Sequence, residues 1–285
     1  IAITALAVLL SGCGTSQNFQ SQTISENDVS AISIDATTNF SVSRVVVLAN
    51  GVAEIMNALN AKSILVGRDI SSTEKELKNI PIVTSGHQVM PEKIIELKPD
   101  LVIIDASTGP KAALDQIRNA GIKIVETPES WTLTDIPTKV SAVATAIGAP
   151  QQGDLLNQAF AKELKTSAIA TKPRIAFLYL RGTSSVYLIG GPGSGSDSLI
   201  QAIGATDVGA KSLLNPFNTM TAESLATLNP DVIIVMTKGL QSVGGISGLL
   251  KLPGVAQTQA GKNQAVIDVD DSLLLSFGPR TPSLV

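Results

Sequence analysis

The chain has 285 residues, of which 44% are hydrophobic, 16% are charged and only 3% are aromatic. This composition excludes an intrinsically disordered chain, and the length suffices for one large domain or two medium-sized ones. The formal net charge is −3 and no basic run occurs, so a nucleic-acid partner has no electrostatic support. No apolar run reaches the ~18 residues that a transmembrane helix needs.

The first residues form an apolar run, IAITALAVLL, which is followed by small residues and by Cys13. This order is typical of a secretory signal whose front part is missing. Residues 10–13, Leu-Ser-Gly-Cys, resemble the lipobox of bacterial lipoproteins, in which the signal is cleaved before a cysteine that becomes acylated. We expect residues 1–13 to be a signal remnant and Cys13 to be a lipid anchor, because lipidation explains a lone unpaired thiol. The alternative is a buried N-terminal strand with an incidental cysteine.

The next segment, residues 14–42, is rich in Ser, Thr, Asn and Gln and lacks sustained periodicity. It predicts a flexible tether between the anchor and the folded body. Residues 43–132 then alternate short β-branched runs, such as RVVVLA and DLVIID, with segments of helical periodicity. The helix predicted from MPEKIIELKP has Pro91 near its first turn, where the missing N–H costs nothing. This alternation predicts an α/β lobe with a mostly parallel sheet.

Residues 133–170 hold no strand signal and repeat their apolar positions at helical spacing, with a possible break at residues 148–150. We expect a long helical linker there. In residues 171–285 the first pattern returns: MTAESLATLNPDVIIVM parallels MPEKIIELKPDLVII, so that Asp231 corresponds to Asp100. Such a repeat predicts two similar lobes with a cleft between them, where ligands preferentially bind.

This organisation resembles the substrate-binding proteins of ABC importers that have a rigid helix between their lobes. The runs LYLRGTSSVYLIGGPGSGSDSLIQAIGA and LLLSFGPRTP are similar to haem-binding lipoproteins of Gram-positive importers, and the resemblance covers residues 44–282. It implies an α/β fold of two Rossmann-like lobes, each with a mostly parallel sheet flanked by helices, joined by one long inter-lobe helix. That family continues through a C-terminal helix, so we expect the second lobe to be truncated here.

His87 is the one histidine of the sequence and follows Gly86 on a loop after a short apolar strand. Ligands of parallel α/β sheets bind at the carboxyl ends of the strands, and imidazole is a common axial ligand of haem iron. The resemblance implies a haem-ligating histidine at this position. The alternative is a loop or core histidine whose nitrogens are satisfied by neighbouring groups.

Tyr179 ends the predicted strand IAFLYL, and strand alternation places Arg181 on the same side. A guanidinium beside a phenol favours the phenolate, a hard anionic ligand suited to ferric iron. The family's Tyr-x-Arg pair matches these residues and implies axial ligation by Tyr179, although a core tyrosine beside a strand-end arginine is the alternative. We expect Tyr187 to be structural.

The resemblance also implies two pocket contacts in the second lobe, Met236 at a strand end and Phe217 beside the porphyrin. Met236 is a pocket contact or reserve ligand, and the alternative is a core residue. Haem propionates require cations or solvent at the cleft mouth, and three cations are candidates by position: Arg68, Lys238 and Arg280. The alternative for each, which the sequence favours, is an ordinary surface charge. Acidic residues near two equivalent helix starts, Glu54 and Asp197, are candidates for docking to arginines of a permease. An acid in the first turn is also ordinary helix-end electrostatics.

We therefore expect a lipid-anchored haem-binding protein at the extracytoplasmic face of the membrane, on a Gram-positive cell surface. It would carry ferric haem b to an ABC permease and could receive it from upstream surface haem-capture proteins. With both axial positions filled no site remains for oxygen or peroxide, so we expect no enzyme. The alternatives are a cobalamin or ferric-siderophore carrier of the same class and an exported haem enzyme. A zinc or manganese carrier is disfavoured because such sites use several histidines and carboxylates.

Overall fold

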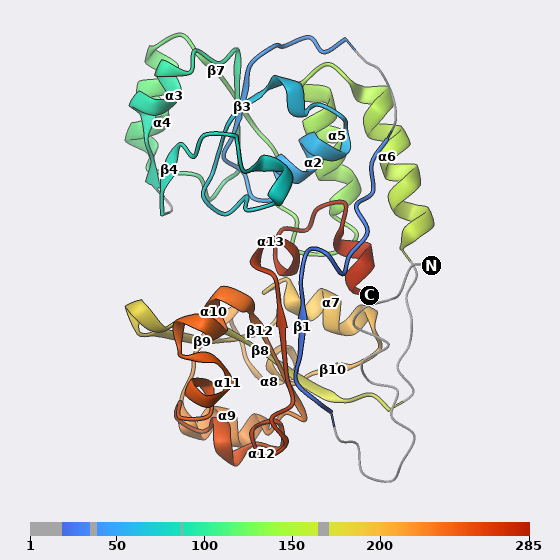
Figure 1. Ribbon diagram of the computed structural model, residues 1–285, viewed down its shortest axis with the longest axis vertical. Helices are drawn as coiled ribbons and strands as arrows, with labels where there is room; N and C mark the ends of the chain where they lie inside the picture. Colours follow the sequence, from blue (N-terminus) through green and yellow to red (C-terminus); the bar gives the residue numbers. More distant parts are fainter. Residues whose placement is uncertain (1–18, 35–38, 87, 165–170) are drawn as a thin grey trace.

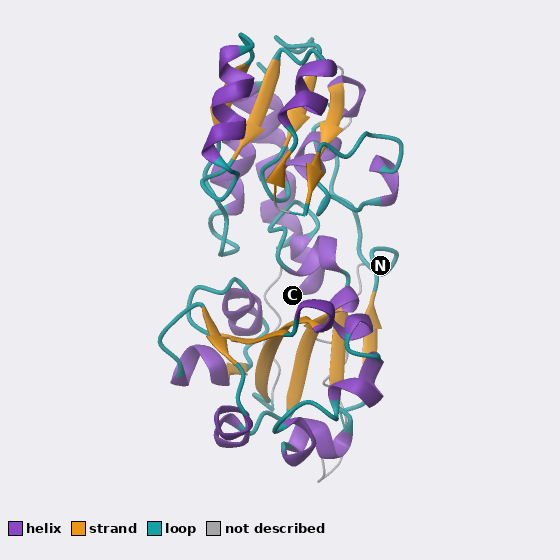
Figure 2. Cartoon of the chain, turned by 90° about the vertical axis from the view of Figure 1, so that its left-hand side faces the viewer, coloured by secondary structure: helices purple, strands orange, loops and turns teal. Residues whose placement is uncertain are grey.

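The computed structural model describes residues 19–34, 39–86, 88–164 and 171–285. Figure 1 shows two lobes, one above the other, and Figure 2 shows that each lobe contains its own sheet with helices around it. No helix in the described part of the chain combines the length and apolarity that crossing a membrane requires.

The first lobe is built on a four-stranded, fully parallel sheet with the strand order β3-β2-β6-β7. Its strands are short and apolar because helices cover the sheet. The strands are β2 (Val45–Val47), β3 (Leu65–Arg68), β6 (Leu101–Ile104) and β7 (Lys123–Glu126), and a separate hairpin is formed by β4 (Thr84–Ser85) and β5 (Gln88–Val89). The helices are α2 (Val52–Ala58), α3 (Pro91–Glu96) and α4 (Lys111–Asn119), with the 3-10 turns η1 (Lys62–Ile64) and η2 (Lys75–Leu77).

The second lobe has a seven-stranded sheet in the order β1-β13-β12-β8-β9-β11, with β10 also paired to β8. Its pairs are parallel except β8–β9 and β9–β11. The strands are β1 (Gln22–Ile24), β8 (Arg174–Arg181), β9 (Val186–Gly190), β10 (Thr206–Asp207), β11 (Phe217–Thr219), β12 (Val232–Met236) and β13 (Val266–Val269). The helices are α7 (Ser196–Ala202), α8 (Val208–Ser212), α9 (Ala222–Leu228), α10 (Thr237–Ser242), α11 (Gly245–Leu249), α12 (Gln259–Asn263) and α13 (Asp271–Leu274), with the 3-10 turns η3 (Gly182–Ser184), η4 (Val255–Gln257) and η5 (Thr281–Leu284).

The internal repeat has an atomic counterpart in two aspartates that precede equivalent strands. The Asp100 carboxylate accepts the backbone N–H of Arg44 at 2.9 Å, and the Asp231 carboxylate accepts that of Arg174 at 2.9 Å. In each lobe the same type of contact therefore fixes the start of a central strand, β2 or β8, against its neighbour.

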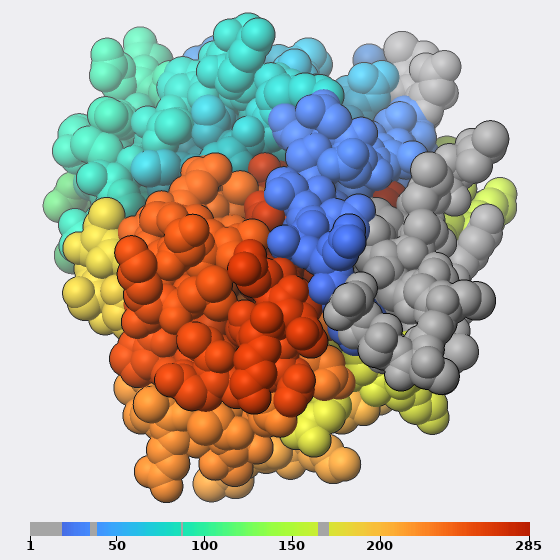
Figure 3. All heavy atoms as spheres, turned by 60° about the horizontal axis from the view of Figure 1, so that its bottom comes forward, coloured from blue at the N-terminus to red at the C-terminus, as the bar shows by residue number. Residues whose placement is uncertain are grey.

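The predicted tether is partly wrong. β1 pairs in parallel with β13, and the Thr23 hydroxyl donates to Asp268 at 2.8 Å. Farther along, the N–H of Ile34 bonds to the carbonyl of Ala58 in the first lobe. Figure 3 shows this N-terminal segment in blue beside the orange and red second lobe. Its polar composition suits an edge strand, since only Ile24 of β1 is buried; Cys13 lies outside the described residues.

The predicted linker is two helices and not one long helix. α5 (Ile136–Ala146) and α6 (Pro150–Glu163) pack against each other in the upper right of Figure 1. Gly148 between them has a φ of 79°, a left-handed conformation that ends a right-handed helix, and Pro150 begins the next. The break suspected at residues 148–150 is real and changes the direction of the chain.

The end of the chain does not belong to the second lobe alone, contrary to the predicted boundary at residues 171–285. We name residues 275–281 the inter-lobe strap. The Asn50 side chain donates to the carbonyl of Leu275 at 2.8 Å, and Phe277 is fully buried. Figure 1 shows the red C-terminal part between the two lobes, so the strap connects them in addition to the α5–α6 linker.

Candidate functional site

Two cavities lie where the lobes face each other, and Ser71 lines both of them. The first-lobe pocket has a volume of about 260 Å³ and lies at the carboxyl ends of the first lobe's strands. The second-lobe pocket has a volume of about 350 Å³ and is lined by Ile70 and Ser71 opposite residues of β8, β12 and α10. Together they form the inter-lobe cleft that the repeat predicted.

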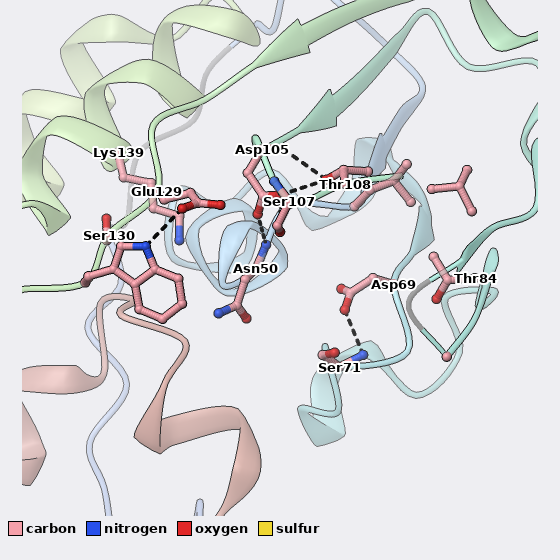
Figure 4. A pocket seen from close by; sticks show the side chains of 14 residues that line it. Asn50, Asp69, Ser71, Thr84, Asp105, Ser107, Thr108, Glu129, Ser130 and Lys139 are labelled. Carbon is pink, nitrogen blue, oxygen red and sulfur yellow. Dashed lines mark hydrogen bonds between the residues drawn. The ribbon is translucent and has the colours of Figure 1, made fainter. Parts of the chain in front are cut away.

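Carboxylates in the first-lobe pocket accept hydrogen bonds from the loops around it. Asp69 follows β3 and accepts the N–H of Ser71 at 2.7 Å and the hydroxyl of Ser72. Asp105 follows β6 and accepts the N–H of Asn50 at 3.0 Å, together with groups of Ser107 and Thr108. Burial raises the pKa of Asp69 despite these hydrogen bonds. These carboxylates thus order the pocket's loops, as Figure 4 shows.

A second group in this pocket was missed by the sequence analysis. Lys139 of α5 is only 2% exposed, and burial lowers the pKa of its ammonium group to about 8. Its Nζ donates to the carbonyl of Ser276 in the inter-lobe strap at 3.4 Å. The Trp131 indole donates to Glu129 at 2.9 Å, and the residue is 38% exposed. The signal that could have identified Trp131 is its place shortly after a predicted strand, as the one tryptophan of the sequence.

The second-lobe pocket contains the predicted tyrosine–arginine pair. Arg181 Nε donates to the Tyr179 hydroxyl, and the guanidinium carbon lies 5.2 Å from the centre of the tyrosine ring. Phe217 packs edge-on against Tyr179, with ring centres 5.8 Å apart and planes at 66°. The predicted placement of Tyr179 and Arg181 on one side of β8 is confirmed, and Phe217 is brought beside them from β11.

Met236 and Lys238 complete this wall of the cleft. Met236 ends β12 and is half-buried, whereas Lys238 near the start of α10 is exposed, and both line the pocket that contains Tyr179. Tyr187 lies on β9 and packs against the core of the second lobe, as expected of a structural residue. Of the predicted site residues, the structure therefore gathers Tyr179, Arg181, Met236 and Phe217.

The prediction for His87 lies outside the described residues. The residues around it are informative: Gly86, with a φ of 56°, and Val89 both line the first-lobe pocket. No group of three or more His, Cys, Asp or Glu side chains suited to a metal ion occurs among the described residues.

Of the three cations predicted as candidates for binding haem propionates, two are excluded by their burial. Arg68 is buried, and its guanidinium donates to backbone carbonyls, including that of Ser72 at 2.6 Å. Arg280 is buried too and pairs with Glu54 at 3.2 Å and Glu74 at 3.3 Å. Both guanidinium groups hold protein segments together, which leaves Lys238 as the exposed member of the three.

The two predicted docking acids have different environments. Glu54 is 5% exposed, and its carboxylate accepts the N–H of Arg280 at 2.6 Å beneath Gly278 of the strap. A carboxylate covered in this way cannot contact a partner, so the structure contradicts its docking role. Asp197 is half-exposed and accepts the N–H groups of Gly193 at 2.8 Å and Gly195 at 3.0 Å, so it orders the loop before α7.

The sequence profile described as Periplasmic binding protein matches residues 45–273. The ABC transporter substrate-binding lipoprotein YvrC of Bacillus subtilis is 26% identical over 98% of this chain and 91% of its own length. The vitamin B12-binding protein of Pectobacterium atrosepticum is 26% identical over 72% of each chain.

Solved structures agree with the two-lobed fold. The heme-binding protein RhuT of Roseiflexus sp. RS-1 superposes with a TM-score of 0.81 at 37% identity, covering 85% of this chain and 95% of RhuT. The heme binding protein HmuT superposes with a TM-score of 0.82 at 32% identity, covering 95% of this chain and 96% of HmuT. The expected α/β fold of two lobes with sheets flanked by helices is thereby confirmed.

Proposed function

This chain belongs to the periplasmic binding protein family, and we propose that it captures haem in its inter-lobe cleft and delivers it to the permease of an ABC importer. The observation that carries the proposal is the hydrogen-bonded pair of Tyr179 and Arg181 on one wall of that cleft. Among similar structures, RhuT and HmuT are named heme-binding proteins, and HmuT was solved with a tyrosine, an arginine or a histidine replaced by alanine.

Tyr179 supplies the iron ligand in this proposal. Its oxygen already accepts a hydrogen bond from a guanidinium group, which stabilises negative charge on that atom. An anionic oxygen is a suitable axial ligand for ferric haem b. Phe217 fixes the plane of the phenol from its edge, and Met236 provides an adaptable apolar contact in the same pocket.

His87 supplies the second axial ligand from the first lobe. The proposal is supported by Gly86 and Val89, which line the pocket that faces the second lobe. With one axial bond from each lobe, the flat porphyrin is held between two walls. Such a site favours carriage over turnover, because the iron has no open position for oxygen or peroxide.

Delivery requires that the protein stay near the permease. We assign this role to Cys13 as the lipid anchor, which would hold the chain at the extracytoplasmic face of a Gram-positive cell membrane, within reach of surface haem-capture proteins. The relative YvrC is described as a lipoprotein, which supports the anchor. Asp197, half-exposed in the first turn of α7, remains the proposed contact to the permease on the second lobe.

The test is a hemin titration of the purified folded body followed by the Soret band. We expect a saturable Soret shift that changes in Tyr179→Phe and in His87→Ala. The matched control is Tyr187→Phe, which removes the same hydroxyl group from the neighbouring strand and should bind hemin like wild type. No Soret shift with wild type, or an unchanged spectrum in both site variants, would overturn the proposal.

A cobalamin carrier is the second candidate, and the vitamin B12-binding relatives favour it. Cyanocobalamin competition in the same titration separates the two: an excess should not displace hemin if the Tyr179 oxygen binds iron. Peroxide turnover well above that of free hemin would instead indicate an exported haem enzyme.

A further inference from the structure

The two pockets of the cleft carry opposite charge. The first-lobe pocket is lined by three carboxylates, those of Asp69, Asp105 and Glu129, against the single buried ammonium of Lys139. The second-lobe pocket is lined by the side chains of Arg181 and Lys238 against the carboxylate of Asp271. A ligand with carboxylate groups on one edge therefore meets attraction at the second lobe and repulsion at the first.

Of the cations that line the two pockets, Lys238 is the best placed to meet such a ligand. Lys139 is 2% exposed and already donates to the strap carbonyl of Ser276. Arg181 donates to Tyr179. Lys238 is exposed, and no carboxylate among the described residues lies within salt-bridge distance of its ammonium.

The backbone of Lys238 is fixed although its side chain is exposed. Its N–H donates to the Asp271 carboxylate at 2.9 Å, which anchors the first turn of α10 to α13. The Asp271 carboxylate also attracts the Lys238 ammonium electrostatically. Lys238 thus extends from a fixed backbone position and lines the same pocket as Tyr179 and Met236.

We propose that Lys238 is the cation that binds the carboxylates of the captured porphyrin and so sets its orientation, with the propionate edge toward the second lobe. This inference rests on the proposed haem function and adds a selectivity to it. An anionic porphyrin is favoured over a tetrapyrrole whose carboxylates are masked as neutral amides or esters.

The experiment compares Lys238→Gln with Lys262→Gln, a control on α12, which Figure 1 shows at the far end of the second lobe. Both residues are exposed, and both variants remove one positive charge from this lobe. Hemin and hemin dimethyl ester, which lacks free carboxylates, are titrated against each protein. We expect Lys238→Gln to weaken hemin binding by about two- to fivefold, to leave dimethyl ester binding unchanged, and to lose most of its effect at high salt. Lys238→Glu should weaken hemin binding further.

Equal hemin affinities for Lys238→Gln and Lys262→Gln, or an equal loss for hemin and its dimethyl ester, would overturn the inference while wild-type binding keeps the proposed function intact. Absence of hemin binding by wild type would instead overturn the proposed function, and this inference with it.

Discussion

On the first-lobe wall of the cleft, Asp69 and Asp105 each accept a backbone N–H from the loop that follows their own strand, β3 or β6. On the second-lobe wall, Arg181 contacts the Tyr179 hydroxyl and Lys238 is exposed to the cleft. Behind the first wall, Arg280 joins Glu54 and Glu74 below the protein surface. A charge near the cleft can therefore either stabilise the fold or be available to a ligand, and burial distinguishes the two roles. Substitutions of the buried charges should therefore change the free energy of unfolding, whereas substitutions on the second-lobe wall should change hemin affinity.

The largest effect is expected from Arg280→Met. The variant leaves the buried carboxylates of Glu54 and Glu74 without their cation, which should cost about 3–5 kcal/mol of the free energy of unfolding. Urea unfolding followed by circular dichroism measures the loss. Arg118→Met is the matched control, since Arg118 pairs with Asp115 on the surface and its loss should hardly change the midpoint. Equal midpoints for both variants would contradict the assignment of Arg280 to the fold.

The second-largest expected effect is a pH dependence of the free energy of unfolding that arises from Glu74. Burial, and next the carboxylate of Glu54, raise the pKa of Glu74 from 4.5 to about 7. The folded state then binds the proton more tightly than the unfolded chain, so this stabilisation is complete below about pH 4.5 and is lost as the pH rises through about 7. Between about pH 8 and about pH 5, wild type should gain about 2 kcal/mol relative to Glu74→Gln.

Urea unfolding of both proteins at the two pH values measures this gain. The difference between wild type and Glu74→Gln must change with pH. If it stays constant, Glu74 is ionised throughout the range and its burial does not control its titration.

The third effect belongs to the second-lobe wall. Arg181→Leu removes the charge-assisted hydrogen bond to Tyr179, which should weaken hemin binding about tenfold and shift the Soret band. The free energy of unfolding should stay nearly unchanged because Arg181 is exposed. Arg174→Leu, at the opposite end of the same strand β8, is the control and should bind hemin normally. A loss of stability without a loss of hemin affinity would place Arg181 among the structural charges.

The smallest effect is expected at Trp131. Its ring lines the first-lobe pocket and is the one tryptophan of the sequence, so hemin bound in the cleft should quench the intrinsic fluorescence. Trp131→Phe should nearly retain hemin affinity, because in the proposed site the porphyrin carboxylates meet the second-lobe wall and not the first. A Soret shift without fluorescence quenching would show that hemin binds away from this wall.

Much of the fold could be predicted from local pattern. The β-branched runs of β2, β6 and β12 are buried on both faces, and the repeat that aligned Asp100 with Asp231 corresponds to the same backbone contact in each lobe. The strand β1 could not be predicted, because its polar residues form an edge strand only when β13 is present beside them. The turn at Gly148 was suspected from composition, but the packing of α5 on α6 follows from tertiary contacts.

The candidate site, like the fold, could be predicted only in part from the sequence. Alternation along one strand determined that Tyr179 and Arg181 lie on one side, since that relation spans only two residues. Glu54 and Asp197 occupy equivalent positions in the repeated sequence, yet one is covered by Arg280 and the other is half-exposed. Arg280 is 226 residues from Glu54 in the chain. The proposed iron ligands, His87 and Tyr179, were predicted from the sequence alone. Which charges are buried could not be predicted, because burial depends on contacts between segments far apart in the chain that no local pattern records.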